Sequence, residues 1–518
     1  MNQRDVFGRD DVALPTATEA TAVDREAEAR HGIPSRVLME NAGRSAALVV
    51  DRLFPRGRVV AAVGGGNNGG DALVLLRTLR AWGRDVAALP VGRRAPDAAL
   101  AHGHEVPRLD PGTASTAFAD AAVVVDGILG TGATGAPRED AAAVVRQINA
   151  SGRPVVALDV PTGVDPTTGR IPGEAVCANV TLCFGWPKQG LMFQPGRGRC
   201  GRLIALEIAF PPDSAGRPPS AALLTPGWAA ARLPMRAPDA YKGTAGELLV
   251  LAGRAGVAGA AAIASHAAGR AGAGYVRLAS SAANRAVLQT VVPEAVFVDR
   301  DDEAALAAAA ATADAILVGP GMGTDADGRT AFERLLDRTP GTPALLDADA
   351  LTLLGREPDA VRRRIGERPL VLTPHPGEAH RLSGWPIERI REAPLEAARS
   401  LAERFAAVVL LKGAPSVIAA PDVPTLIGTV GSSELAKAGM GDQLAGTIGA
   451  FLAAGVPART AAALGLFYSG RAADLAARGP ALQPRDVSEH LDRAFADPGP
   501  AVPPLGFPFI TFDQPARW

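Results

Sequence analysis

The 518-residue sequence has few cysteines, few aromatic residues and almost no net charge. Its three cysteines, an odd number in so long a chain, exclude a disulfide framework, and their spacing does not match a zinc site. Lys plus Arg total 53 and Asp plus Glu 54, which argues against binding nucleic acid or an anionic membrane through bulk charge. Aromatic residues make up only 4 %, so the cores must be built from Ala, Val, Leu and Ile.

Long hydrophobic runs are absent as well. No stretch of about 18 uninterrupted apolar residues is present that could cross a membrane. Residues 1–15 are polar and lack the apolar core of a secretory signal. We therefore expect a cytoplasmic protein that has neither a membrane nor a nucleic acid as a partner.

The sequence does contain two long regions in which short apolar runs alternate with helical patterns, separated by a proline-rich stretch at 210–239. Proline interrupts helices and cannot donate to a sheet ladder, so this stretch is expected to be a linker or a domain edge. Alternating strands and helices predict βαβ units and parallel sheets. We expect two tandem α/β domains, at 1–222 and 223–500, followed by a tail at 501–518 that is frayed or packed on the surface.

The apolar runs place the elements of both domains. In the first domain, we expect strands at 58–63, 121–126 and 154–159 and helices at 71–82 and 138–151. In the second domain, we expect strands at 247–253, 274–279, 315–319, 344–348, 370–374 and 408–413 and helices at 260–272, 394–406 and 443–455.

Each predicted strand of the first domain runs into a glycine-rich or polar turn. GGGNNGGD follows the first strand, GILGTGATGA the second and VPTGVD the third. Ligands of open parallel sheets bind beyond the carboxyl ends of the strands, and a helix start suits phosphate. The alternative, tight connections with Asp71 as a helix cap, explains one such turn better than three together. The residues predicted to share one polar crevice are Asn67, Asn68, Asp71, Asp126 and Asp159.

These residue types indicate a phosphate-bearing small molecule and carboxylates that can move a proton, without specifying the reaction. The GGGNNGGD turn is also not the G-x-G-x-x-G pattern of dinucleotide-binding domains, which carries an acidic residue about 20 positions further on. The identity of the ligand therefore depends on a closer match to a family.

Five motifs of this region resemble, in order and spacing, the NAD(P)H-hydrate epimerase domain. They are GIPSRVLMENAG (32–43), GGGNNGGDALVLLR (64–77), VVDGILGTGATG (124–135), ALDVPTGVDPTTG (157–169) and TLCFGWPKQGL (181–191). The resemblance implies a Rossmann-like doubly wound sheet and potassium ligands at Asn68, Asp126 and Thr162. The contacts with the hydrated dinucleotide that it implies are Asn67, Asn68, Gly69, Gly70, Asp71, Gly130, Thr131, Gly132, Ala133, Thr134, Gly135, Ala136 and Asp159.

Asp159 is our candidate for the acid–base residue of this domain. The hydrate carries a hydroxyl on the ring carbon next to the ring nitrogen, and protonation lets it leave because the nitrogen lone pair stabilises the resulting iminium ion. Water then returns to either face. A positioned carboxyl group contributes typically about 10²–10⁴-fold to such a step. The alternative is a non-catalytic scaffold, since relatives of this domain exist that only bind partners, and the intact Asp126 and Asp159 weigh against it.

The second domain carries GMGD (439–442) directly before a predicted helix. Backbone N–H groups at such a helix start can cradle a phosphoryl group, and Asp442 beside them can take a proton from a hydroxyl. The P-loop pattern G-x-x-x-x-G-K-[ST] is absent. A plain N-cap role for Asp442 is the alternative. Other polar strand ends accompany the motif: GPGMG (319–323), LDADAL (346–351), TPHPGEAHRL (373–382) and LKGAPS (411–416).

Two histidines lie close together in HPGEAH, and we expect neither to bind zinc. The spacing differs from that of a helical H-E-x-x-H, and Pro376 and Gly377 argue against a helix on which the motif could lie. His375 follows a predicted strand and could contact a ligand, whereas His380 is expected to be an ordinary helix residue.

The second-domain motifs resemble the ribokinase-like fold and, more narrowly, the ADP-dependent NAD(P)H-hydrate dehydratase domain. The match runs in order from YKGTAGELLVLAG at 241 to LAKAGMGDQLAGTIGAFLAAG at 435–455, and TPHPGE is its most specific part. Two departures are AGMGD, where GGSGD or GGTGD is usual, and GSSEL (431–435) in place of a Gly-Asn start. Met440 thereby removes a hydroxyl that could reach phosphate.

The resemblance also implies roles for individual residues, with Asp442 as the catalytic base and Mg²⁺ accompanying ADP. Contacts with the hydrate are implied for Ala260, Gly323, His375 and Asp442. Contacts with the adenine nucleotide are implied for Lys412, Gly413, Ala414, Pro415, Ser416 and Gly441.

Together the two resemblances imply a bifunctional metabolite-repair enzyme, an isomerase and a lyase that act on NADHX and NADPHX. The first domain would interconvert the R and S hydrates, and the second would dehydrate the S form with ADP to give AMP and phosphate. The alternative for the second domain is a kinase of a small, vitamin-like alcohol. We also expect a homo-oligomer.

Overall fold

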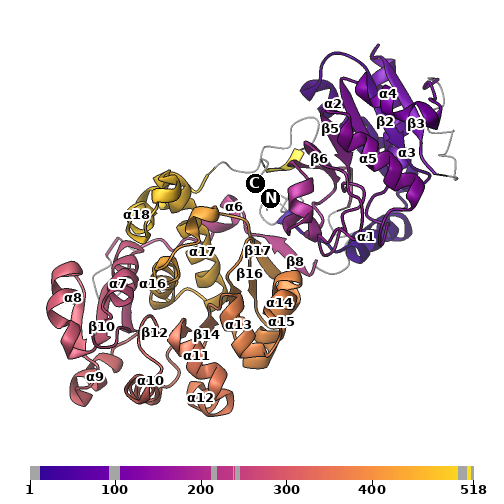
Figure 1. Ribbon diagram of the computed structural model, residues 1–518. Helices are drawn as coiled ribbons and strands as arrows, with labels where there is room; N and C mark the ends of the chain where they lie inside the picture. Colours follow the sequence, from indigo (N-terminus) through magenta and orange to yellow (C-terminus); the bar gives the residue numbers. More distant parts are fainter. Residues whose placement is uncertain are drawn as a thin grey trace. The chain divides into compact units, whose positions relative to one another are not determined.

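The computed structural model describes residues 12–92, 105–211, 219–236, 238–239, 245–499 and 510–514 (Figure 1). The chain forms two compact units, Met1–Leu223 with Ala501–Trp518, and Leu224–Pro500. Each unit is built on its own parallel-rich sheet, so the prediction of two tandem α/β domains is confirmed. Residues 241–244, which open the first motif of the second domain, lie outside the described residues.

The sheet of the first unit is parallel except for one edge strand and reverses its strand order near its middle. Its spatial order is β18 (Ile510–Gln514), β7 (Arg202–Leu206), β6 (Val180–Phe184), β5 (Val155–Leu158), β4 (Val123–Gly127), β2 (Val59–Val63) and β3 (Val86–Pro90). The predicted strands correspond to β2, β4 and β5. Because the chain moves from β2 to β3 and then back to β4, the switch point lies between β2 and β4, where such sheets bind ligands.

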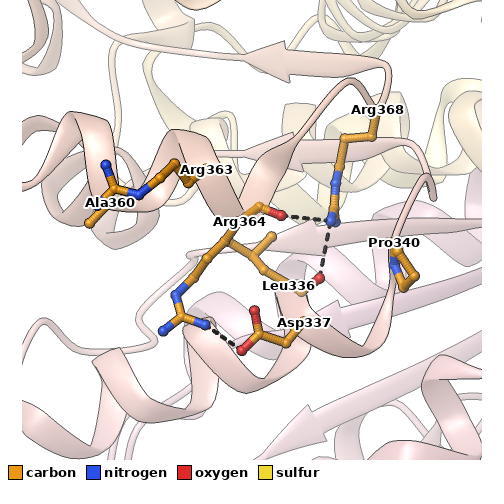
Figure 2. A pocket seen from close by; sticks show the side chains of 7 residues that line it. All are labelled: Leu336, Asp337, Pro340, Ala360, Arg363, Arg364 and Arg368. Carbon is orange, nitrogen blue, oxygen red and sulfur yellow. Dashed lines mark hydrogen bonds and ion pairs between the residues drawn. The ribbon is translucent and has the colours of Figure 1, made fainter.

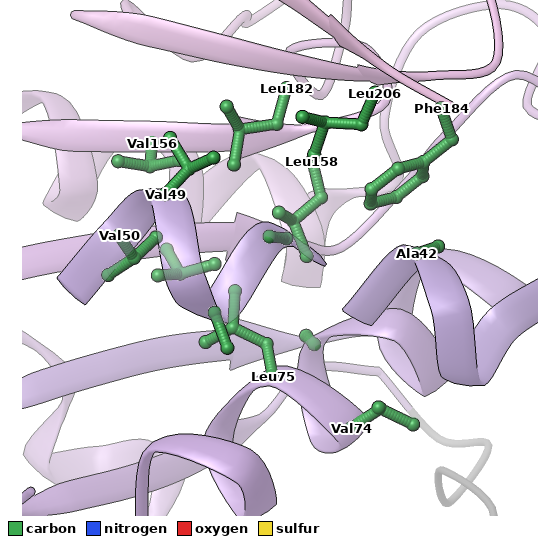
Figure 3. Packing of buried hydrophobic residues seen from close by; sticks show 14 of the residues in the cluster. Ala42, Val49, Val50, Val74, Leu75, Val156, Leu158, Leu182, Phe184 and Leu206 are labelled. Carbon is green, nitrogen blue, oxygen red and sulfur yellow. The ribbon is translucent and has the colours of Figure 1, made fainter. Parts of the chain in front are cut away.

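Helices cover both faces of this sheet, which confirms the doubly wound arrangement. Val59 and Ala61 of β2 pack in one cluster, whereas Val60 and Ala62 pack in another, as the two-residue period of a strand requires. The first cluster includes residues of α1 (Ala17–His31), α2 (Ser35–Leu53) and α3 (Asn67–Ala81) (Figure 3). The second includes residues of α4 (Ala114–Ala119) and α5 (Glu139–Ala150).

The terminal tail was expected to be either frayed or packed on the surface. Its described part is not frayed but forms β18, which pairs antiparallel with β7. Phe512 is buried, and the Asp513 carboxylate accepts a hydrogen bond from Arg202 Nε at 2.7 Å. A short strand near the start of the chain, β1 (Val12–Ala13), likewise pairs with β8 (Ala221–Leu223). Partners so distant in sequence leave no local pattern from which either pairing could be predicted.

The second unit has a longer sheet that is parallel from β11 to β15. Its spatial order is β17 (Thr425–Gly428), β16 (Ser416–Ala419), β15 (Val408–Leu411), β14 (Leu370–Leu372), β13 (Ala344–Leu346), β12 (Ala315–Val318), β9 (Glu247–Leu251), β10 (Tyr275–Ser280) and β11 (Val296–Asp299). Strands β16 and β17 are antiparallel. The predicted strands are β9, β10, β12, β13, β14 and β15, and the switch point lies between β9 and β12.

The helices of the second unit include those predicted at 260–272, 394–406 and 443–455. The full set is α6 (Pro226–Ala230), α7 (Gly259–Arg270), α8 (Arg285–Val291), α9 (Glu303–Ala310), α10 (Ala326–Arg338), α11 (Asp349–Arg356), α12 (Pro358–Ile365), α13 (Pro376–Ser383), α14 (Ile387–Glu392), α15 (Pro394–Phe405), α16 (Met440–Ala453), α17 (Ala458–Ala476), α18 (Pro484–Glu489) and α19 (Leu491–Ala496). Among the described residues, no helix is both long and apolar enough to span a bilayer.

Helix α13 overturns the argument that Pro376 and Gly377 exclude a helix. Pro376 occupies the first helical position, where its missing N–H costs nothing and its fixed φ suits the helix. His375 caps this helix, and its Nδ1 accepts a hydrogen bond from Gly377 N at 3.0 Å. Helices α3 and α16 also begin earlier than expected, at Asn67 and Met440, so that both glycine motifs lie in the first turn of a helix.

Candidate functional sites in the two domains

The first candidate site lies at the carboxyl ends of β2, β4 and β5, where the three predicted turns meet. Gly69 packs so closely that a Cβ placed on it would lie 1.8 Å from the carbonyl oxygen of Gly64. A Cβ placed on Gly130 would lie 3.2 Å from Asn68 Cγ and 3.4 Å from Asp159 Oδ2. Position 69 therefore requires glycine, whereas a side chain at position 130 would only crowd Asn68 and Asp159, which both border Gly130.

Asp159 is held by two neighbours immediately after β5. Its φ of 64° is unusual for a residue other than glycine, and such strain concentrates at functional sites. Its Oδ2 accepts a hydrogen bond from Thr131 N at 3.1 Å and another from the Thr131 hydroxyl, and Oδ1 accepts one from Lys188 Nζ. Burial works to raise the pKa of Asp159, but Lys188 and Thr131 outweigh it and hold this pKa below its usual value.

Lys188 is a site residue that the sequence did not single out. It lies just before the short helical turn η3 (Gln189–Met192), its side chain is 5 % exposed, and its Nζ also donates to the carbonyl oxygen of Phe184 at 3.0 Å. Although it belongs to a motif of the family resemblance, only the adjacency of β5 and β6 brings it to Asp159. Burial opposes a raised pKa, yet the charge of Asp159 raises the pKa of Lys188, so the pair is ionised.

Two further carboxyl groups in this crevice behave differently from Asp159. Burial, followed by the negative charges of Asp159 and Asp24, holds the pKa of Asp71 well above its ordinary value. Burial also raises the pKa of Asp24 to about 6, although its residue as a whole is exposed on α1. Asp71 was predicted from the sequence, whereas Asp24 lies on a helix that carries no recognised motif. Neighbouring carboxyl groups with separated pKa values suit acid–base work.

The three predicted potassium ligands lie close to one another, because Asn68 and Thr162 both bond to the backbone of Leu129 and Thr162 also bonds to Asp126. Asn68 Nδ2 donates to the carbonyl oxygen of Leu129 at 3.0 Å, and Thr162 Oγ1 accepts from Leu129 N at 3.0 Å. The fully buried Asp126 accepts hydrogen bonds from Thr162 N at 2.8 Å and Thr162 Oγ1 at 2.7 Å. Asn68 Oδ1 is buried with no hydrogen-bond partner among the described residues. Hard oxygen donors of this kind fit an alkali cation.

Only part of the loop after β4 lies in the crevice. Gly130 and Thr131 contact the predicted site residues, and Ala133 N bonds to the carbonyl oxygen of Gly130 at 3.0 Å. Asn67 is exposed at the start of α3, whereas Gly69 and Gly70 are buried. The predicted contacts on the outer part of the loop, which are all exposed, are Gly132, Thr134, Gly135 and Ala136.

The second candidate site lies at the carboxyl ends of β13, β14 and β15. Asp347, Thr373 and Lys412 each directly follow one of these strands. Lys412 Nζ donates to Asp347 Oδ1 at 2.9 Å, and the Thr373 hydroxyl donates to the same oxygen at 2.8 Å. Asp347 belongs to the LDADAL motif, but the sequence did not identify it as a site residue.

Asp442 lies in the first turn of α16, one residue after Gly441. Burial raises the pKa of Asp442 to about 7, with the charge of Asp347 as the next cause and Lys412 acting against it. Gly439, which caps the helix at a φ of 85°, allows the sharp entry into this turn. Met440 is buried, and its apolar side chain has no hydroxyl that could contact a phosphate.

His375 and Glu378 line the same crevice from α13. Glu378 Oε2 accepts a hydrogen bond from His375 N at 2.9 Å and lies 3.8 Å from Lys412 Nζ. Burial raises the pKa of Glu378, whereas burial and the nearby Lys412 lower the pKa of His375. Neutral imidazole is therefore the form of His375 that would meet a ligand at neutral pH.

The remaining predicted contacts fall into two loops of this site. Gly323 N donates to Asp349 Oδ2 at 2.9 Å, and a Cβ placed on Gly321 would lie 3.3 Å from Ala260 Cβ, so Ala260 and Gly323 border one loop. The loop after β15 is closed by the Ser416 hydroxyl, which donates to the carbonyl oxygen of Gly413 at 3.0 Å. In the same loop, Ala414 is exposed and Pro415 is half-buried.

A pocket in the second unit involves none of these residues (Figure 2). It lies where β13 and β14 begin, at the opposite end of the strands from the site. The buried Arg368 donates to the carbonyl oxygens of Ile365 at 2.6 Å and Leu336 at 3.0 Å, which end α12 and α10. This arginine thus satisfies helix termini, and the pocket is a structural feature rather than the candidate site.

Comparison with known proteins gives both halves a family. Residues 248–493 match the family described as NAD(P)H-hydrate dehydratase, and residues 35–190 match the family described as YjeF-related protein N-terminus. The bifunctional NAD(P)H-hydrate repair enzyme Nnr of Salinibacter ruber is 40 % identical over 501 residues, covering 89 % of this chain and 91 % of that protein. The Escherichia coli enzyme of the same name is 35 % identical, with 88 % of each chain covered.

Solved structures also match the second half. The ADP/ATP-dependent NAD(P)H-hydrate dehydratase from Bacillus subtilis, co-crystallised with ATP and Mg²⁺, is 31 % identical, covers 53 % of this chain and 97 % of its own, and superposes with a TM-score of 0.47. The extent and identity of the full-length matches establish that this chain belongs to the family of bifunctional NAD(P)H-hydrate repair enzymes.

Proposed function

We propose that this chain repairs hydrated NAD(P)H with two activities. The first domain interconverts the R and S hydrates, and the second dehydrates the S form with ADP, giving NAD(P)H, AMP and phosphate. The observation that carries the proposal is that one chain holds two crevices, each with a Lys–Asp ion pair that has one buried member, beside a second carboxyl group of raised pKa. A dehydratase that accepts one epimer needs a partner that converts the other.

In the first domain, Asp159 and Asp71 are the groups placed to handle the proton. The hydroxyl of the hydrate is protonated, the ring C–O bond breaks, and the nitrogen lone pair forms an iminium ion. Asp159, ionised beside Lys188, stabilises this cation and can take the proton from the returning water. Asp71, whose pKa is raised, is the better donor of the first proton. Asn67, Gly69, Gly70 and the loop at 130–136 contact the dinucleotide.

Potassium is proposed at Asn68, Asp126 and Thr162. When bound, the ion would supply positive charge beside the dinucleotide. The buried Asn68 Oδ1, which has no partner among the described residues, would be its amide ligand. We expect K⁺ to raise the thermal midpoint of the wild-type chain more than Na⁺ does, and expect this difference to disappear in Asn68→Ala.

In the second domain, Asp442 takes the proton from the hydroxyl of the hydrate. The freed oxygen attacks the terminal phosphoryl group of ADP, and the bond from that phosphorus to AMP breaks. Phosphate then leaves with help from the ring nitrogen, and loss of a neighbouring ring proton restores the double bond. Mg²⁺ bound with ADP would shield the phosphate charge.

The two ligands of the second domain are proposed to contact different groups around Asp442. The hydrate contacts Ala260, Gly323 and His375. The nucleotide contacts Gly441 and the loop after β15, which comprises Lys412, Gly413, Ala414, Pro415 and Ser416.

The test is to incubate the protein with mixed hydrate epimers, with and without ADP. We expect recovery of the near-ultraviolet absorbance of reduced nicotinamide only with ADP, together with AMP and phosphate in equal amounts. A stable phosphorylated product would instead identify a small-molecule kinase. Bound ligand without turnover would identify a scaffold.

The state of the protein in the cell stays a prediction. We propose that it works in the cytoplasm as a homo-oligomer, on small molecules alone. Light scattering on the purified chain would test the oligomer, and a monomer at all concentrations would contradict it.

A further inference from the structure

Asp347 stands at the centre of the second crevice without a role in the scheme above. It is 2 % exposed and directly follows β13, a strand flanked by β12 and β14 in the parallel part of the sheet. Its Oδ1 accepts hydrogen bonds from both Lys412 and Thr373. Removing a carboxylate this deeply from water is costly, so its retention there calls for an explanation beyond packing.

The backbone around Asp347 is strained and tightly packed. Ala348, the next residue, has φ 49° and ψ −115°, a conformation that L-residues rarely adopt. A Cβ placed on Gly319 would lie 1.8 Å from the carbonyl oxygen of Asp347, and Asp347 N bonds to the carbonyl oxygen of Val318 at 3.1 Å. Strain of this kind persists where the surrounding structure fixes a residue for function.

The partner of Asp347 reaches the start of α16. A Cβ placed on Gly441 would lie 3.4 Å from Lys412 Nζ and 3.7 Å from Asp347 Oδ2. The Lys–Asp pair therefore borders the residue next to Asp442, at the helix start proposed to cradle the phosphoryl group. Lys412 is also 3.8 Å from Glu378, so a second carboxylate could draw the ammonium away from this place.

A lysine ammonium is a point charge on a flexible stem, and its effect depends on what fixes it. We propose that Asp347 is a positioning residue of the second site, which holds the Lys412 ammonium at the start of α16 so that it faces the phosphoryl group passing from ADP to the hydrate. The inference rests on the proposed function. It assigns to Asp347 no contact with either substrate.

Asp347 also affects the pKa of Asp442, the proposed base. The charged groups that act on Asp442 are Asp347 and Asp349 around the start of α11, Glu378 of α13, and Lys412 after β15. Burial raises the pKa of Asp442 to about 7, with Asp347 as the next cause and Lys412 opposing it. If Asp347 becomes neutral while Lys412 stays charged, the pKa of Asp442 must fall.

The experiment compares wild type with Asp347→Asn, Thr373→Val and the surface control Asp337→Asn. Dehydration of the purified S hydrate with ADP is measured over a pH series centred on about 7, and epimerisation by the first domain of the same chain reports the amount of active protein. The thermal unfolding transition of each variant, recorded without ligand, shows whether its second domain is folded.

For Asp347→Asn we expect kcat to fall by about 10- to 100-fold, because a small misplacement of a catalytic charge costs that much, and the acidic limb of its pH profile to move to lower pH. Thr373→Val removes a hydrogen bond and no charge, so its kcat falls less and its limb stays in place. Asp337→Asn behaves as wild type.

Three results would overturn the inference: a wild-type kcat in Asp347→Asn, a lower kcat with an unmoved acidic limb, or a limb that shifts equally in Thr373→Val. If the second domain of Asp347→Asn does not fold, Thr373→Val decides the matter, since an unchanged kcat there would mean that the support of Asp347 is dispensable. Failure of wild type to dehydrate the hydrate with ADP would instead reject the proposed function.

Discussion

Both crevices contain a lysine–aspartate ion pair, but the aspartate of the pair has a different role in each. In each, a lysine pairs with an aspartate that directly follows a parallel strand, Lys188 with Asp159 and Lys412 with Asp347. In the first crevice, the paired aspartate is itself the proposed reactive group. In the second, it stands beside the reactive group, Asp442.

The difference decides which carboxyl group is ionised. Lys188 and Thr131 outweigh burial and lower the pKa of Asp159, whereas burial and the charge of Asp347 raise the pKa of Asp442 to about 7. A permanent carboxylate suits a reaction that passes through an iminium cation. A carboxyl group near its midpoint at neutral pH suits the removal of a proton from a hydroxyl. A lysine–aspartate pair thus serves a different chemistry in each crevice, because the paired aspartate reacts in the first and a neighbouring carboxyl group reacts in the second.

The largest expected effect comes from Asp442→Asn. Without the base, ADP-dependent dehydration should fall by at least about 100-fold, while exchange between the epimers continues, because the two crevices lie in separate units. The rise in absorbance of reduced nicotinamide measures the first activity, and NMR on a single epimer measures the second. Loss of both activities would show that the domains do not act independently.

Asp159→Asn should give the reciprocal result, with a somewhat smaller loss because Asp71, the proposed donor of the first proton, remains in the crevice. Epimer exchange catalysed by the protein should fall by about 100-fold, and dehydration of pure S hydrate should keep its rate. NMR on one purified epimer is the measurement. Exchange at the wild-type rate would remove Asp159 from the reaction.

Lys188→Met should show how much the ion pair of the first crevice contributes to the stability of the folded protein. It leaves the buried Asp159 without its cation, which we expect to cost about 3–5 kcal/mol in the free energy of unfolding. The folded-state pKa of Asp159 then rises above its unfolded value, so the lost stability is largest at neutral pH and is partly regained as the pH falls through that raised pKa.

Thermal unfolding of Lys188→Met, Asp159→Asn and the double variant measures this coupling. We expect the double variant to be more stable than Lys188→Met alone, because it leaves no uncompensated charge. Additive losses from the two changes would show that the ion pair does not contribute.

The smallest effect expected is the pH dependence of the unaltered chain. Dehydration requires ionised Asp442, so its kcat should rise as the pH increases through about 7. Ionisation of Asp159, which is complete at lower pH, should leave no rising limb near 7 in the epimerase profile, whereas loss of the proton from Asp71 would make that rate fall as the pH increases. Rate profiles of both activities from one preparation test this, and coincident limbs would contradict the assignment.

The sequence predicted those features that depend on local pattern. Strands such as β2 and β12 are buried on both faces, so they appear as apolar runs ended by glycine, and the residues that follow them could be placed at one edge of a sheet. The candidates Asp126 and Asp159 were chosen in this way, and Asp442 from the glycine motif before its helix.

Features that depend on distant partners could not be predicted. The roles of Lys188 and Asp347 follow from strand neighbours that only the folded sheet provides. Strand β18 exists because β7 offers an open edge. The start of α13 was misjudged because Pro376 was considered a helix breaker, although at the first helical position it favours the helix.

The most direct test of the central claim, that separate acids in the two crevices act on one hydrate, is complementation. Pure R hydrate and ADP are supplied to wild type, to Asp159→Asn, to Asp442→Asn and to a mixture of the two variants, and the absorbance of reduced nicotinamide is followed. The account predicts rapid recovery with wild type and with the mixture, only slow recovery with Asp159→Asn, and almost none with Asp442→Asn. Wild-type recovery by either variant alone, or no gain on mixing, would contradict it.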